Sequence, residues 1–195
     1  MQATYPVGFV RALIDTDAVT TSTRAALEAR LSTPVVTVPR FFTALEFAVL
    51  QAVCARLLPG LRIDIAGEID ARLAADIGDG WRYEVLPPDR RAYQVGLAGV
   101  EQAAQGIFGR GFRVLTSDEQ GTVLTAVQTN TAPGVAWQTV PAIRFFEELL
   151  AEATEIYFAH PLAQEAIGYA GMADAPGWER IGLDERDDRE PQAHS

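Results

Sequence analysis

Thiol and imidazole groups, which bind many metals and carry out much acid–base catalysis, are scarce in this chain of 195 residues. They comprise one cysteine, Cys54, and two histidines, His160 and His194. An iron–sulfur cluster uses about four thiolates, and a structural zinc site uses about four nitrogen or sulfur ligands. A c-type haem is attached through two cysteines that precede a histidine. We therefore expect no metal, haem or cluster site here, and any redox centre to belong to another protein.

Cys54 and His160 both favour structural roles over catalytic ones. Cys54 falls on the apolar face of a predicted helix, where a free cysteine acts as a small hydrophobe. His160 follows Tyr157, Phe158 and Ala159 at the end of another predicted helix. A histidine there can contact the last carbonyl groups of the helix and is favoured by its dipole. We assign no catalytic, cofactor-binding or metal-binding residue.

Carboxylates offer a further possibility for chemistry. Glu148, Glu152 and Glu155 are spaced four and three residues apart, so a helix would place them on one face. A metal site would need a second set of ligands from another helix. The spacing is more typical of a solvated acidic face, or of a surface that meets an arginine-rich partner.

The charge of the chain excludes some classes of partner. Its 16 basic residues are all arginine, and 26 acidic residues give a net charge of −10. Such a surface repels nucleic-acid phosphates and anionic lipids. No window approaches the roughly 18 apolar residues of a membrane span, and the first residues do not resemble an export signal. We expect a cytoplasmic protein, exported only if a partner carries the signal.

Apolar residues recur with helical spacing along most of the chain. The helix at 41–58 is the most apolar and is expected to be central, whereas 32–40 contains two prolines and is expected to be an extended connector. Asp64 is expected to cap a helix, and Ser117 with Gln120 forms a predicted capping box. The predicted helices cover residues 22–31, 41–58, 64–77, 89–105, 117–129, 141–159 and a short segment at 162–167.

These helices predict an all-α fold, an irregular bundle of about six or seven helices with a loop-rich aromatic C-terminal arm. We expect one helical domain over residues 1–183, in which 160–183 form the arm. Residues 184–195 contain five acidic residues and two arginines, and are expected to form a disordered tail.

The C-terminal arm carries aromatic and methionine side chains on a mostly irregular segment, which is typical of an interface core. The alternative, equally open, is that the arm folds back and covers its own bundle. The residues expected to bind a partner are Tyr157, His160, Pro161, Gly168, Tyr169, Gly171, Met172 and Trp178.

Motifs in this region resemble the gluconate 2-dehydrogenase subunit 3 family, over roughly residues 40–182. The motifs are Phe-Phe-Glu-Glu-Leu-Leu at 145–150, Tyr-Phe-Ala-His-Pro at 157–161, Gly-Tyr-Ala-Gly at 168–171, Gly-Trp at 177–178 and Ile-Gly at 181–182. Upstream, Leu57-Leu58-Pro59, Ile69-Asp70 and Leu73 also resemble the family.

The resemblance implies a non-catalytic small subunit of a flavin-dependent sugar or alcohol dehydrogenase complex. The large subunit, of the glucose–methanol–choline type, would carry FAD and oxidise a sugar or polyol, and a cytochrome c subunit could accept the electrons. Many members of the family carry a twin-arginine export signal, which does not occur near the start of this sequence.

Two alternatives remain open at the level of sequence. The chain could be a stand-alone helical enzyme or ligand-binding protein that uses His160, Glu155 and Tyr169 around a pocket. It could also be an interaction module whose partner has no redox activity. A single histidine at a helix end offers few groups for catalysis, which favours the accessory-subunit interpretation over the enzyme.

Overall fold

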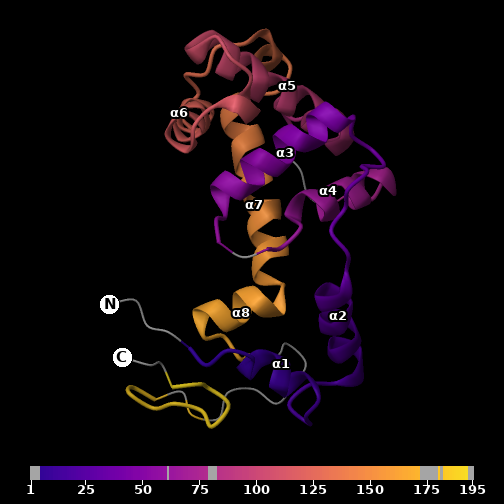
Figure 1. Ribbon diagram of the computed structural model, residues 1–195, viewed down its shortest axis with the longest axis vertical. Helices are drawn as coiled ribbons and strands as arrows, with labels where there is room; N and C mark the ends of the chain where they lie inside the picture. The colour runs from indigo at the N-terminus through magenta and orange to yellow at the C-terminus, as the bar shows by residue number, and fades with distance from the viewer. Residues whose placement is uncertain (1–4, 61, 79–82, 172–179, 181, 193–195) are drawn as a thin grey trace. The chain divides into compact units, whose positions relative to one another are not determined.

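The computed structural model describes residues 5–60, 62–78, 83–171, 180 and 182–192. All regular secondary structure in these residues is helical, which confirms the predicted all-α fold (Figure 1). The α-helices are α1 (Phe9–Ile14), α2 (Thr21–Ser32), α3 (Ala44–Leu57), α4 (Ile65–Ala74), α5 (Asp89–Phe108), α6 (Ser117–Gln128), α7 (Ala142–Phe158) and α8 (Pro161–Ile167). Two short 3₁₀ helices are η1 (Phe112–Val114) and η2 (Val135–Gln138).

The chain forms two compact units. Unit 1 combines residues 1–34 with 157–195, and unit 2 comprises residues 35–156. Helices α1, α2 and α8 belong to unit 1, α3 to α6 belong to unit 2, and α7 runs from unit 2 into unit 1. Two compact units can belong to one domain, so the expected single domain stays a prediction.

Helices α3 and α5 form the core of unit 2. Helix α5 packs against α3, α6 and both 3₁₀ helices, and α3 also packs against α4 and α6. Leu50 and Val53 on α3 and Leu97 and Val100 on α5 are at most 1% exposed. The predicted centre at 41–58 is therefore part of the core, but α5 shares that position.

Close approach to α5 requires small residues on one of its faces. A Cβ at Gly96 would overlap the ring of Phe145 on α7, and one at Gly99 would lie 2.5 Å from the Trp137 ring on η2. Gly106 lies inside α5, which ends instead at Gly109 with a positive φ of 66°. The helix therefore continues past the predicted end at 105, because Gly109 supplies the left-handed cap that glycine adopts readily.

Two helix starts were predicted to have side-chain caps, and the structure confirms one of them. Asp64 accepts a hydrogen bond from the Gly67 N–H at 3.0 Å, as expected. The capping box of α6 is formed by Thr116 and Glu119, one residue before the predicted pair, which corrects that prediction. Both candidate pairs have suitable side chains, so the composition of the segment did not distinguish the two registers.

The connector that precedes α3 is held by two carboxylates of unit 2. Asp64 accepts a hydrogen bond from the Val36 N–H at 2.6 Å. Asp70, which is fully buried, accepts the N–H groups of Arg40, Phe41 and Phe42 at 2.7 to 3.0 Å. These bonds satisfy the backbone of an extended segment without a neighbouring strand.

Unit 1 has a smaller core, formed by Val10, Ile14, Val19 and Leu27. Helix α1 was not among the predicted helices. It packs against α8, where the buried Glu165 accepts hydrogen bonds from the Gly8 N–H at 2.6 Å and from Arg11 Nε at 2.7 Å. This long-range pair stabilises a six-residue helix that its own sequence would not.

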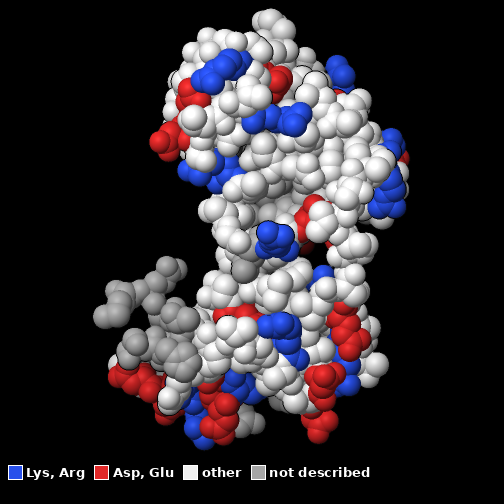
Figure 2. All heavy atoms as spheres, viewed as in Figure 1, with Lys and Arg blue, Asp and Glu red and all other residues white. Residues whose placement is uncertain are grey.

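Charged side chains occur in small clusters on the surface. Figure 2 shows acidic residues and arginines beside one another in several mixed groups, with uncharged residues covering much of the rest of the face in view. Among the helices of the described residues, none is long and apolar enough to cross a membrane.

Candidate partner-binding surfaces

Six of the eight residues predicted to bind a partner lie in the described part of unit 1. Tyr157 is in the last turn of α7, and His160 and Pro161 begin α8. Gly168, Tyr169 and Gly171 follow α8. The other two, Met172 and Trp178, lie outside the described residues.

His160 caps the start of α8, whereas the sequence predicted contacts with the last carbonyl groups of α7. Its Nδ1 accepts the Leu162 N–H at 3.2 Å, and its Nε2 lies 3.1 Å from the Arg30 carbonyl oxygen on α2. The Arg30 guanidinium in turn donates to the Ala159 carbonyl at 3.0 Å. Both ring nitrogens of His160 therefore contact backbone groups, and neither is free for acid–base chemistry.

Gly168 ends α8 in the left-handed conformation, with a φ of 75°. A Cβ at this position would lie 2.5 Å from the ring of Tyr5, so both backbone conformation and space require glycine. The turn directs the chain into Tyr169, whose N–H donates to the Gln164 carbonyl at 2.9 Å. Gly168 therefore forms a tight turn at the end of α8.

The segment from α7 to Tyr169 leaves large apolar side chains exposed. Phe158 is 39% exposed, Ile167 51% and Tyr169 46%. Tyr157 is half-buried and packs edge-to-face on Phe158, with 5.1 Å between the ring centroids, whereas Pro161 is buried within unit 1. We call Phe158, at the end of α7, together with Ile167 and Tyr169 of the predicted arm, the arm residues. Phe158 and Ile167 were not among the residues predicted to bind a partner. For Ile167, its place directly before Gly168, at the end of a predicted helix, was an available signal.

In unit 2, the predicted acidic face of α7 is not fully solvated. Glu152 is 9% exposed and accepts two hydrogen bonds from Arg72, at 2.6 and 2.8 Å, and one from the Tyr93 hydroxyl. Arg72 also donates to Asp89 at 2.8 Å. A helix does place Glu148, Glu152 and Glu155 at neighbouring positions, but their spacing does not reveal which of them faces the partly buried Arg72.

Protonation in this network is set by burial and by the ion pairs. Burial raises the pKa of the fully buried Tyr93, and the adjacent Glu152 carboxylate raises it further. Burial lowers the pKa of Arg72, but its bonds to Glu152 and Asp89 outweigh burial, so the guanidinium stays charged. The donors around Glu152 therefore link α4, α5 and α7 as a structural group.

The thiol of Cys54 is buried in unit 2. Burial raises the pKa of Cys54 to about 12, so its thiol stays protonated at neutral pH. No group of three or more histidine, cysteine, aspartate or glutamate residues in the described part of the chain could hold a metal ion.

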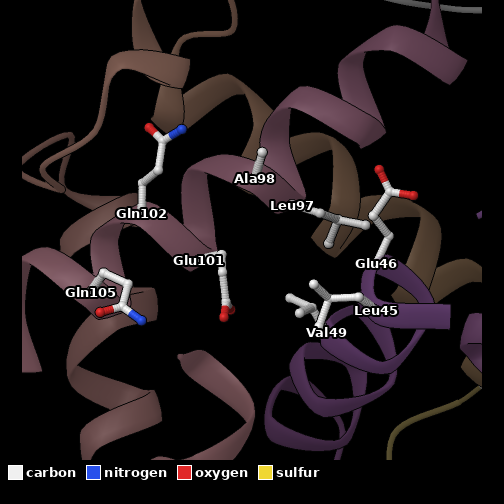
Figure 3. A pocket seen from close by; sticks show the side chains of 8 residues that line it. All are labelled: Leu45, Glu46, Val49, Leu97, Ala98, Glu101, Gln102 and Gln105. Atoms are coloured by element: carbon white, nitrogen blue, oxygen red, sulfur yellow. The ribbon is translucent and has the colours of Figure 1, made fainter. Parts of the chain in front are cut away.

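Helices α3 and α5 of unit 2 border an apolar groove with a volume of about 400 Å³. Figure 3 shows Leu45 and Val49 on α3, and Glu101 on α5, pointing into the space between the helices. Gln102 instead accepts the Ala136 N–H at 3.1 Å. The lining residues are Leu45, Glu46, Val49, Leu97, Ala98, Glu101, Gln102 and Gln105. No local pattern in the sequence indicates this groove, because its residues come from two separate helices.

Known protein families include one whose model matches most of this chain. A family model described as gluconate 2-dehydrogenase subunit 3 matches residues 44–182, from the first turn of α3 to beyond Tyr169. No curated protein and no solved structure matches the chain. Because the family model covers well over half of the sequence and includes the arm residues, this protein belongs to the gluconate 2-dehydrogenase subunit 3 family.

Proposed function

We propose that this protein is the non-catalytic small subunit of a dehydrogenase complex, which binds and stabilises an FAD-dependent large subunit of the glucose–methanol–choline type. That large subunit would bind the flavin and oxidise a sugar or polyol. Membership of a dehydrogenase subunit family supports the proposal. The single structural observation that carries it is the exposure of Phe158, Ile167 and Tyr169 in one short segment.

The arm residues have the properties of interface anchors. Phenylalanine and tyrosine bring large apolar areas with few rotatable bonds, and a buried aromatic anchor contributes about 2 kcal/mol or more to binding. Exposure of about half of each side chain in the isolated subunit leaves that area available for burial. The caps at His160 and Gly168 fix the backbone on both sides of α8, which reduces the entropy lost on binding.

Co-expression tests the proposal directly. The large subunit would be produced with and without this chain, and its soluble yield, flavin content and sugar-dependent dye reduction would be measured. We expect the large subunit alone to be poorly soluble or poorly flavinated. Co-expression with this chain is expected to restore its soluble yield and its flavin content. Equal yield, flavin content and turnover without this chain would contradict the proposal.

Substitution of an arm residue tests whether the arm residues form the surface that binds the large subunit. Tyr169→Ser is expected to weaken binding of the large subunit by about tenfold or more, because it removes a half-exposed ring. Val114→Ser is the matched control, since Val114 is 66% exposed but lies on η1 in unit 2. Surface plasmon resonance measures both. Equal affinities for the two variants would show that another surface binds.

A further inference from the structure

The groove between α3 and α5 has a packed apolar floor and an open apolar edge. Val49 and Leu97 are at most 2% exposed, so the neighbouring core fixes their positions. Leu45, in the first turn of α3, is 58% exposed. The volume of about 400 Å³ suits one or two large apolar side chains. A floor that needs no rearrangement favours binding, because little conformational freedom is lost.

Two carboxylates border this apolar space in fixed positions. Glu46 Oε2 accepts the Thr43 N–H and hydroxyl, each at 2.8 Å. Glu101 Oε2 accepts the Phe112 N–H at 3.0 Å. In each side chain the second oxygen accepts no hydrogen bond from the described residues. The described lining residues include both carboxylates and no arginine, so the groove combines an apolar floor with negative charge.

We propose that this groove binds an apolar segment of the dehydrogenase large subunit that is flanked by arginine or lysine side chains. The apolar residues would cover Leu45 and Ala98, which are exposed, and the cations would approach Glu46 and Glu101. This inference rests on the proposed function, because it takes the large subunit as the partner. A second copy of this chain is disfavoured as occupant, because each copy has a net charge of −10.

The charge requirement is tested with Glu46→Gln. Glutamine can replace glutamate in a capping box, so the helix start is kept while the charge is lost. We expect the affinity for the large subunit to fall about threefold at low salt, with the difference shrinking as salt increases. Glu119→Gln is the matched control, because Glu119 has the same capping role in α6 outside the groove. Equal effects of the two substitutions, or no effect of Glu46→Gln, would overturn the charge requirement.

Occupation of the groove is tested by photo-crosslinking within the full complex. Benzoylphenylalanine would replace Ala98, which is exposed in the groove, or Tyr169, and the crosslinked peptides would be identified by mass spectrometry. We expect Ala98 to crosslink to an apolar large-subunit peptide that contains arginine or lysine. Crosslinking from Tyr169 but not from Ala98, or crosslinking of Ala98 to a second copy or to an acidic peptide, would overturn the groove proposal alone. Absence of large-subunit crosslinks from both positions would contradict the proposed function as well.

Discussion

His160 illustrates how the hydrogen bonds of one side chain can depend on its protonation state. Its Nδ1 accepts the Leu162 N–H, so this nitrogen must carry no proton. Its Nε2 faces the Arg30 carbonyl oxygen, so that nitrogen must carry the proton. Both contacts therefore require one neutral tautomer. Burial lowers the pKa of His160, an effect that the Arg30 carbonyl partly opposes and the charge of Arg30 reinforces.

The first prediction concerns the pH dependence of folding. Because the pKa of His160 is lower in the folded than in the unfolded protein, its contribution to stability is present above the unfolded value of about 6.5 and is lost as the pH falls below it. His160→Asn keeps a capping side chain that does not titrate. We expect the stability of the wild type to fall more than that of the variant between pH 7 and pH 5, measured by urea unfolding. Parallel curves would contradict this assignment.

The second prediction separates a buried carboxylate from an exposed one on the same helix. Glu152→Gln removes the charge that Arg72 and Tyr93 face and is expected to destabilise the protein by about 3 kcal/mol. Glu155→Gln is the control, because Glu155 is exposed, and its expected effect is within about 0.5 kcal/mol. Urea unfolding measures both. Similar values for the two variants would show that the Glu152 network does not stabilise the fold.

At the scale of the element, α5 combines a long helix with glycines at the positions where other elements approach it closely. Helix propensity favours alanine over glycine by about 1 kcal/mol at an interior position. Gly96 and Gly99 are kept because Phe145 and Trp137 occupy the space that a Cβ would fill. Packing therefore outweighs local propensity on this face of α5.

The third prediction compares two glycine substitutions with opposite expected signs. Gly96→Ala forces a methyl group against the buried Phe145 ring and is expected to destabilise by about 1–3 kcal/mol. Gly121→Ala on α6 has no neighbour nearer than Arg56 Nε at 3.8 Å, and is expected to stabilise by about 0.5–1 kcal/mol. Thermal unfolding distinguishes the two. A stabilising Gly96→Ala would contradict the close packing of α5 against α7.

At the scale of the whole molecule, the two units are stabilised by different interactions. Unit 2 has the larger apolar core and the Glu152 network. Unit 1 depends more on the pair between Arg11 and the buried Glu165. Burial raises the pKa of Glu165, but the bonds from Arg11 and the Gly8 N–H more than offset it, so its pKa lies below the ordinary value.

The fourth prediction uses this pair to separate the stabilities of the units. Glu165→Gln weakens the acceptor for Arg11 and Gly8, so amide hydrogen exchange should accelerate in α1 and α8. Exchange in α3 and α5 is expected to stay unchanged. Mass spectrometry of peptides from both units gives the comparison. Faster exchange throughout the chain would show that unit 2 depends on this pair.

Local sequence patterns were sufficient for the helices with a strong apolar period. The segments predicted at 41–58, 64–77 and 141–159 correspond to α3, α4 and α7, and the short helix at 162–167 corresponds to α8. The Asp64 cap was also predicted correctly. These features depend on residues within a few positions of one another, so the sequence contains the information that determines them.

Features that depend on distant residues were decided only by the tertiary structure. Helix α1 needs Glu165, which lies 154 residues after Arg11, and burial of Glu152 needs Arg72, 80 residues before it. The α3–α5 groove likewise exists only because α3 and α5, which are separate in the sequence, pack together and leave Leu45 and Ala98 exposed along it. Sequence alone therefore determined the helical class and the family resemblance. The partners of the buried charges, and the surfaces left uncovered, followed from packing, because contacts between distant residues have no local signal in the chain.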